Sequence, residues 1–170
     1  TGLAVPRLTP DIIARLDTVL PPYWSKENPV DLVGEFAATT PIQVLEALAA
    51  WEGCDAVIHL GVVGRLHLVC SMLQAVRASG QAIDPAYAEQ GLAMYRQAEQ
   101  DFFVCAAKFM ERYRKPILGV FLDDRKSRTL TDIPGSPYKG VAFLTPERAV
   151  RALASMAAYY GWRKDHEAET

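Results

Sequence analysis

The fold of this chain is decided by residues 55–65, which read Asp-Ala-Val-Ile-His-Leu-Gly-Val-Val-Gly-Arg. The apolar run from Ala56 to Val63 is short, rich in branched side chains and bounded by Gly53 and Gly64. Runs of this kind are typical of strands buried on both faces, which occur in parallel sheets covered by helices. We therefore predict a central strand at residues 56–63 and an α/β fold.

The rest of the chain alternates helical and extended segments, as such a sheet requires. Threonine-proline pairs at residues 9–10, 40–41 and 145–146 predict helix starts, because proline suits the first turn of a helix. We predict a second strand at residues 117–122 and a β-hairpin at 128–144 that turns at 134–137. The predicted helices cover residues 9–20, 40–52, 66–78, 86–114 and 145 onwards, and a frayed polar tail follows residue 162.

The predicted helix at residues 86–114 has an apolar stripe at helical spacing. Its members are Leu92, Tyr95, Phe102, Ala106, Phe109 and Tyr113. This stripe predicts the face with which the helix packs.

Composition excludes several classes of function. The 170 residues suffice for one compact domain, and a net charge of -2 offers no basic face for a nucleic acid. No apolar run approaches the roughly 20 residues of a membrane span, and the N-terminus does not resemble a signal peptide, so we expect a cytoplasmic protein. Cys54, Cys70 and Cys105 are odd in number and lie in apolar surroundings, which predicts buried thiols rather than disulfides or metal ligands.

The glycine turn after the central strand is the first candidate site. Gly61, Gly64 and Arg65 lie where a parallel strand gives way to a helix, which is where open α/β sheets place their ligands. Glycines let the backbone approach a phosphate, and the arginine can pair with it. Turn geometry explains the two glycines equally well, and the lysine and hydroxyl of a phosphate loop are absent.

Three further features carry weaker predictions. His59 stands alone inside the strand, which favours a neutral, hydrogen-bonded core residue, and no histidine or cysteine spacing predicts a metal site. Asn28 and Asp31 flank a proline and either tie down a turn or face a partner domain. Arg125 and Arg128 follow the second strand, either as part of a solvated charge run or as an interdomain contact.

An ordered set of segments points to a known family. In chain order they are Asn28-Pro29-Val30-Asp31-Leu32, the strand from Asp55 to Gly61, Lys115-Pro116-Ile117-Leu118, and Thr145-Pro146-Glu147-Arg148-Ala149-Val150. In this order they resemble the last flavodoxin-like domain of NDP-forming acyl-CoA synthetases, the family of succinyl-CoA synthetase. The resemblance implies a three-layer, mostly parallel sheet over residues 1–163, with an extra helical hairpin, a β-hairpin and a polar tail at 164–170.

The resemblance also implies a function. Similar enzymes convert acyl-CoA, phosphate and a nucleoside diphosphate to acid, CoA and triphosphate through a phosphohistidine on another domain. The family's first strand, glycine-rich loop and helix of this domain would precede the chain, so we expect an inactive fragment without a catalytic residue or cofactor of its own. CoA, ADP or ATP, and magnesium would belong to the parent enzyme.

The implied partners are the CoA-binding, histidine-bearing and ATP-grasp units of a synthetase, and a second copy bound through the helical hairpin. The alternative is a non-catalytic regulatory or interaction domain of the same ancestry, as in the synthetase-like regions of protein acyltransferases.

Overall fold

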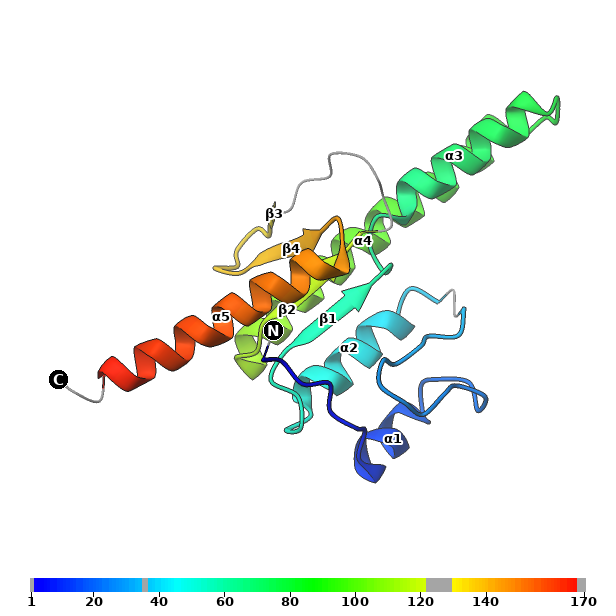
Figure 1. Cartoon of the computed structure of the whole chain (residues 1–170). Helices are drawn as coiled ribbons and strands as arrows, with labels where there is room; N and C mark the ends of the chain where they lie inside the picture. The colour runs from blue at the N-terminus through cyan, green and yellow to red at the C-terminus, as the bar shows by residue number, and fades with distance from the viewer. Residues whose placement is uncertain (1, 35–36, 122–129, 168–170) are drawn as a thin grey trace.

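The computed structural model of the chain describes residues 2–34, 37–121 and 130–167 (Figure 1). Its strands are β1 (Val57–Leu60), β2 (Ile117–Val120), β3 (Leu130–Asp132) and β4 (Lys139–Phe143). They form one sheet in the order β1-β2-β4-β3, in which β3 alone runs antiparallel to its neighbour. Among the described residues β1 is therefore an edge strand, and the prediction of a central strand is wrong, because helices can cover the faces of a strand that has only one neighbouring strand. The chain is therefore an α/β protein with a mostly parallel, mixed sheet.

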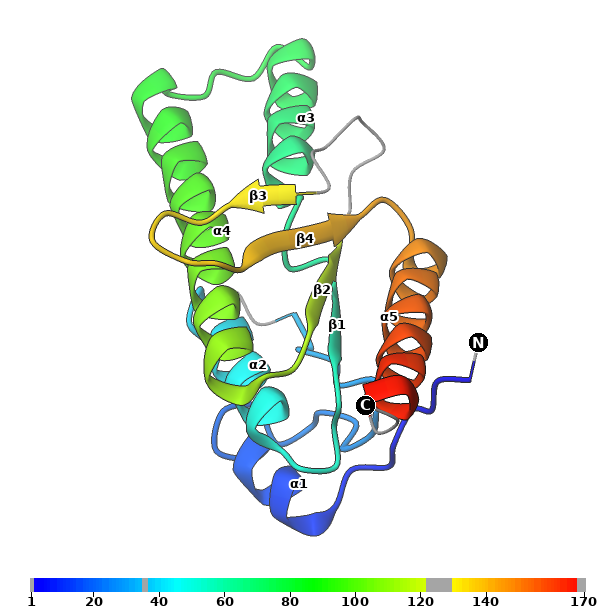
Figure 2. The same ribbon diagram turned by 90° about the vertical axis from the view of Figure 1, so that its left-hand side faces the viewer.

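Helices lie on both sides of this sheet. The helices of the described residues are α1 (Pro10–Leu16), α2 (Thr40–Ala50), α3 (Arg65–Ala78), α4 (Pro85–Tyr113) and α5 (Pro146–Glu167). Helices α2 and α4 lie on one side and α5 on the other (Figure 2). Because side chains alternate along a strand, β1 directs Val57 and His59 toward α4, in register with Ile117 and Gly119 of β2.

The main core fills the space between the sheet and helices α2 and α4. Its buried members include Leu45, Ala49, Val57, Val63, Phe102, Phe103, Ala106, Ala107, Met110, Ile117 and Ala142. A second cluster joins α1 and the segment after it to α2, and contains Ile12, Leu16, Leu20, Trp24, Val44, Ala47 and Trp51. Helix α2 therefore packs on two sides, against the sheet and α4 on one and against α1 on the other.

Most of the predicted elements are present, including the β-hairpin, but several ends differ. The first strand stops at Leu60 instead of residue 63, because Gly61 turns away with φ +69° and Gly64 starts α3 at φ +84°. The first helix ends at Leu16, and residues 17–20 form turns. Helix α5 continues to Glu167, so residues 164–167 of the expected polar tail are helical, although every residue from 155 to 167 is exposed.

The expected helical hairpin is formed by α3 and the first half of α4, which project together from the body (Figure 1). Helix α3 has no buried residue, and all but one of the buried residues of α4 lie between Phe102 and Met110. We call this projecting part, residues 65–98, the arm.

Two smaller findings concern the cysteines and the membrane. The three thiols are free, but each is partly exposed, so the prediction that they are buried is wrong: Cys54 packs at the edge of the core, and Cys70 lies on α3, which has no buried residue. No helix in the described ranges combines the length and apolar character needed to cross a membrane.

Candidate functional site

The turn between β1 and α3 lies at the carboxyl end of the parallel strands. The amide of Gly61 donates to the carbonyl of Val120 (3.1 Å), which closes the ladder between β1 and β2. The Nε of Arg65 donates back to the carbonyl of Gly61 (2.6 Å). The structure therefore brings the three predicted residues Gly61, Gly64 and Arg65 together in one closed turn.

The first amides of α3 have no acceptor within the helix and donate instead to a side chain of α4. Gly64, at the N-cap, has no side chain with which to cap the helix. Instead, the amides of Gly64 and Arg65 both donate to Oε1 of Glu99, at 2.6 and 3.0 Å. A carboxylate at a helix N-terminus is favoured by the helix dipole as well as by the two hydrogen bonds. The turn is therefore an anion-accepting site whose anion is a carboxylate of the same chain.

A small cavity of about 80 Å³ opens beside this turn. Its lining comes from the start of α2, the turn and α4, and consists of Ala37, Ala38, Pro41, Val62, Arg65, Tyr95, Ala98, Glu99 and Phe102. Pockets for cofactors and nucleotides usually measure about 300–1,000 Å³. The cavity can admit water or a small anionic group, but not a nucleotide or coenzyme A.

His59 lies in the core on β1, two residues before Gly61. Its ring meets the ring of Phe102 edge-on, with centroids 4.7 Å apart, and is 9 % exposed. Burial lowers the pKa of His59 to about 4, so the ring is neutral at physiological pH, as the sequence predicted. The prediction that this histidine is hydrogen-bonded is wrong for its Nδ1 atom. Nδ1 has no hydrogen-bond partner in the described part of the chain, because apolar side chains surround it.

The other predicted residues do not join the turn. The Nδ2 of Asn28 donates to the carbonyl of Pro6 (3.0 Å), and Oδ1 of Asp31 accepts from the amide of Val33 (2.9 Å). These contacts order the N-terminal segment, as the structural interpretation of this motif predicts. Arg125 and Arg128 lie outside the described residues.

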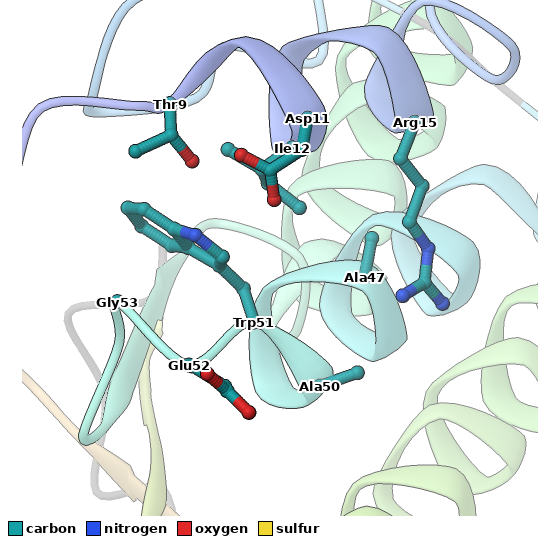
Figure 3. A pocket seen from close by; sticks show the side chains of 9 residues that line it. All are labelled: Thr9, Asp11, Ile12, Arg15, Ala47, Ala50, Trp51, Glu52 and Gly53. Carbon is teal, nitrogen blue, oxygen red and sulfur yellow. The ribbon is translucent and has the colours of Figure 1, made fainter.

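A second hollow, an open groove of about 440 Å³, lies between α1 and the end of α2. Figure 3 shows Thr9 and Asp11 facing the indole of Trp51 across it. A hydrogen bond from Thr9 lowers the pKa of the Asp11 carboxyl. The groove reaches Gly53, just before β1, and so lies at the end of the strand opposite the glycine turn.

We compared the chain with known proteins by family, by sequence and by structure. No family model, curated protein or solved structure matches it. The site is therefore interpreted from its own residues.

Glu99 is the site residue that the sequence analysis missed, although the sequence contains a signal for it. The apolar stripe of α4 passes through Leu92, Tyr95, Phe102 and Ala106, and residue 99 is the position at which this spacing meets a carboxylate. A charged side chain on a packing face needs a partner. The carboxylate on this apolar stripe therefore identifies Glu99 as a candidate. It does not identify the two amides that Glu99 binds, which lie 34 and 35 residues away in the sequence.

Proposed function

We propose that this chain is the phosphohistidine-facing domain of an NDP-forming acyl-CoA synthetase, with the three-layer flavodoxin-like fold of that family. One observation carries the proposal: at the carboxyl end of β1, the amides of Gly64 and Arg65 converge on one carboxylate oxygen. Amides so arranged can accept a phosphoryl oxygen in the same way, because both groups are anionic acceptors. The ordered segments that resemble this family provide independent support.

In this proposal Glu99 keeps the turn ordered while no phosphoryl group is present. An incoming phosphoryl group displaces the carboxylate from the two amides, whose geometry is already set by the helix. The guanidinium of Arg65, tied to the turn through Gly61, then lies beside the added negative charge. The chain itself orients and stabilises an anion and breaks no bond.

The remaining chemistry belongs to companion domains. Among the described residues, no three histidine, cysteine, aspartate or glutamate side chains are grouped so as to hold a metal ion. The cavity beside the turn is also too small for a nucleotide or coenzyme A. In this proposal magnesium, nucleotide and CoA bind to the ATP-grasp and CoA-binding units of a cytoplasmic parent enzyme.

The test is ATP formation by the complete gene product that contains this chain. With a panel of acyl-CoA thioesters, ADP, phosphate and magnesium, we expect ATP to form, and to be lost when residues 1–170 are deleted from an otherwise folded parent. Arg65→Ala should lower kcat by on the order of tenfold or more, because an electrostatic contact to the phosphoryl group is lost. Arg96→Ala, on the exposed surface of α4, is the matched control and should leave kcat unchanged.

No ATP from any thioester, with the histidine-bearing and ATP-grasp domains intact, would contradict the ligase function. The second candidate is then the non-catalytic regulatory domain. One observation favours it: Glu99 already satisfies both amides, so the turn is complete without a ligand. An acetyltransferase domain attached in the same gene, in place of the ATP-grasp unit, would support that function.

A further inference from the structure

The arm exposes large apolar side chains on both of its helices. They are Leu68 and Met72 on α3, and Tyr87 and Met94 on α4, with exposed fractions of 45, 57, 75 and 68 %. Five of the 34 residues of the arm are charged, about 15 %, whereas 22 % of the whole chain is charged, and no charged residue lies between Arg65 and Arg77 on α3. Surface helices normally carry a charged face, so the arm is unusual for a surface exposed to solvent.

Helix geometry places the four exposed side chains on one face of the arm. Among the positions that are not fully exposed, apolar residues recur at helical spacing at Val69, Leu73 and Val76 on α3 and at Ala88, Leu92 and Tyr95 on α4, and we assign this line to the seam between the two contacting helices. On both helices the exposed apolar side chains lie roughly 100° around the helix axis from this seam. They lie on the side occupied by the residue that precedes each seam position. In an antiparallel helix pair, that same rotation brings both sets to the same side.

This face, which we call the apolar face of the arm, carries no ionisable side chain except the tyrosine. Its positions are Leu68, Met72, Ala75 and Ser79 on α3, and Tyr87, Gly91, Met94 and Ala98 on α4. The small residue Gly91 precedes Met94 by about one turn and leaves a recess into which a side chain of a facing helix can pack, whereas Ala98 lies at the base of the arm and lines the cavity beside α2.

The opposite face of the arm is polar. It carries His67, Cys70, Gln74 and Arg77 on α3, and Glu89, Ala93 and Arg96 on α4, and Gln100 continues the same face of α4 just beyond the arm. Arg96 and Glu89 form an ion pair there, at 3.0 Å. The two faces of one hairpin therefore differ in chemistry, and the polar face identifies the side that stays in water.

We propose that the apolar face of the arm pairs with the same face of a second copy of this chain, so that two arms form a four-helix bundle. A face without charges offers a foreign partner no electrostatic complementarity, whereas two identical uncharged faces meet without like-charge repulsion. The arm projects from the body, so two arms can lie together along a twofold axis while the bodies stay apart (Figure 1). This inference does not depend on the proposed ligase function.

The available area agrees with a modest dimer. Helix α3 has 14 residues and is therefore about 21 Å long, and two adjacent helices are about 20 Å wide. Each face then measures roughly 400 Å² in projection, and two faces together bury on the order of 1,000 Å² of accessible surface, the lower end for specific interfaces. We expect a dissociation constant in the micromolar range.

The test is sedimentation velocity of the 170-residue chain over a concentration series from about 1 to about 300 μM, a range that brackets micromolar dissociation constants. The wild-type chain should pass from monomer to dimer within this range. Met72→Glu with Met94→Glu places four carboxylates in the interface and should weaken the dimer by at least about tenfold. Gln74→Glu with Gln100→Glu adds the same charge to the polar face and should leave the dimer unchanged.

Far-ultraviolet circular dichroism establishes that each variant remains helical before its assembly is measured. A wild-type chain that stays monomeric at 300 μM would overturn the proposal and leave the apolar face to another protein. A dimer that persists in the Met72/Met94 variant, or that is lost equally in the Gln74/Gln100 variant, would also overturn it, because the contact would then lie elsewhere.

Discussion

His59 shows how one residue can make stability depend on pH. It is buried against Phe102, and its ring lies so close to Gly119 that a Cβ there would be 2.6 Å from Cε1 of the histidine. With His59 in place, residue 119 on the next strand has to be glycine. Burial in these apolar surroundings favours the neutral ring, and protonation is coupled to unfolding.

We predict that this coupling is measurable between pH 7 and pH 5. The pKa of His59 is lowered from 6.5 to about 4 on folding, so the unfolded chain binds more protons in this range. The stability from this group is complete above pH 6.5 and is lost as the pH falls toward 4. Between pH 7 and pH 5, the free energy of unfolding of the wild type should fall by about 2 kcal/mol more than that of His59→Leu.

Urea denaturation of both proteins at pH 7, 6 and 5 measures this difference. The variant is the control for all carboxyl groups, including Asp17, whose pKa is lowered mainly by hydrogen bonds from Lys26 and Trp24. Parallel pH profiles for the two proteins would show that His59 does not titrate on unfolding.

At the scale of the element, the start of α3 depends on a side chain from another helix. Gly64 supplies the left-handed conformation that the turn needs but no capping group, and Glu99 of α4 takes that role. Helix α4 has a conventional cap instead: the side chain of Asp84 accepts from the amide of Ala86. The two helices of the arm are thus joined by a polar contact at its base.

We predict that Glu99→Ala destabilises the protein by about 1–3 kcal/mol, because two part-buried amides lose their acceptor. Glu99→Gln keeps an acceptor oxygen and should lower the free energy of unfolding by no more than about 1 kcal/mol, because only the attraction between the carboxylate charge and the helix dipole is lost. Glu89→Ala is the control on the same helix, since its exposed ion pair with Arg96 contributes little. Chemical denaturation of the three variants, monitored by circular dichroism, would contradict the assignment if Glu99→Ala were no less stable than Glu89→Ala.

At the scale of the whole molecule, burial is distributed unevenly. All four residues of β2 are buried, and α2 contributes to both core clusters, whereas α3 has no buried residue and the end of α5 is exposed. Local opening requires little free energy where few apolar contacts are lost. The body and the arm should therefore differ in stability although they share α4.

We predict that amides of α3 exchange with solvent at least about a hundredfold faster than those of β2 when the chain is monomeric, because α3 can open without unfolding the body. Hydrogen exchange followed by mass spectrometry, at a concentration below the dimer dissociation constant, measures both segments in one experiment. Slower exchange of α3 at high concentration would accompany the proposed dimer. Equal exchange of α3 and β2 in the monomer would show a single cooperative unit and contradict this prediction.

The sequence by itself determined the elements whose signals are local. Threonine-proline pairs marked the starts of α1, α2 and α5 to within a residue, and periodicity identified α3, α4, β1, β2 and the β-hairpin, because such patterns depend on neighbours along the chain. The tertiary structure alone decided the order of the strands, the union of Glu99 with the amides of Gly64 and Arg65, and the isolation of the His59 nitrogen. Each of these features depends on which distant segments of the chain pack together. Local sequence propensities do not determine those contacts.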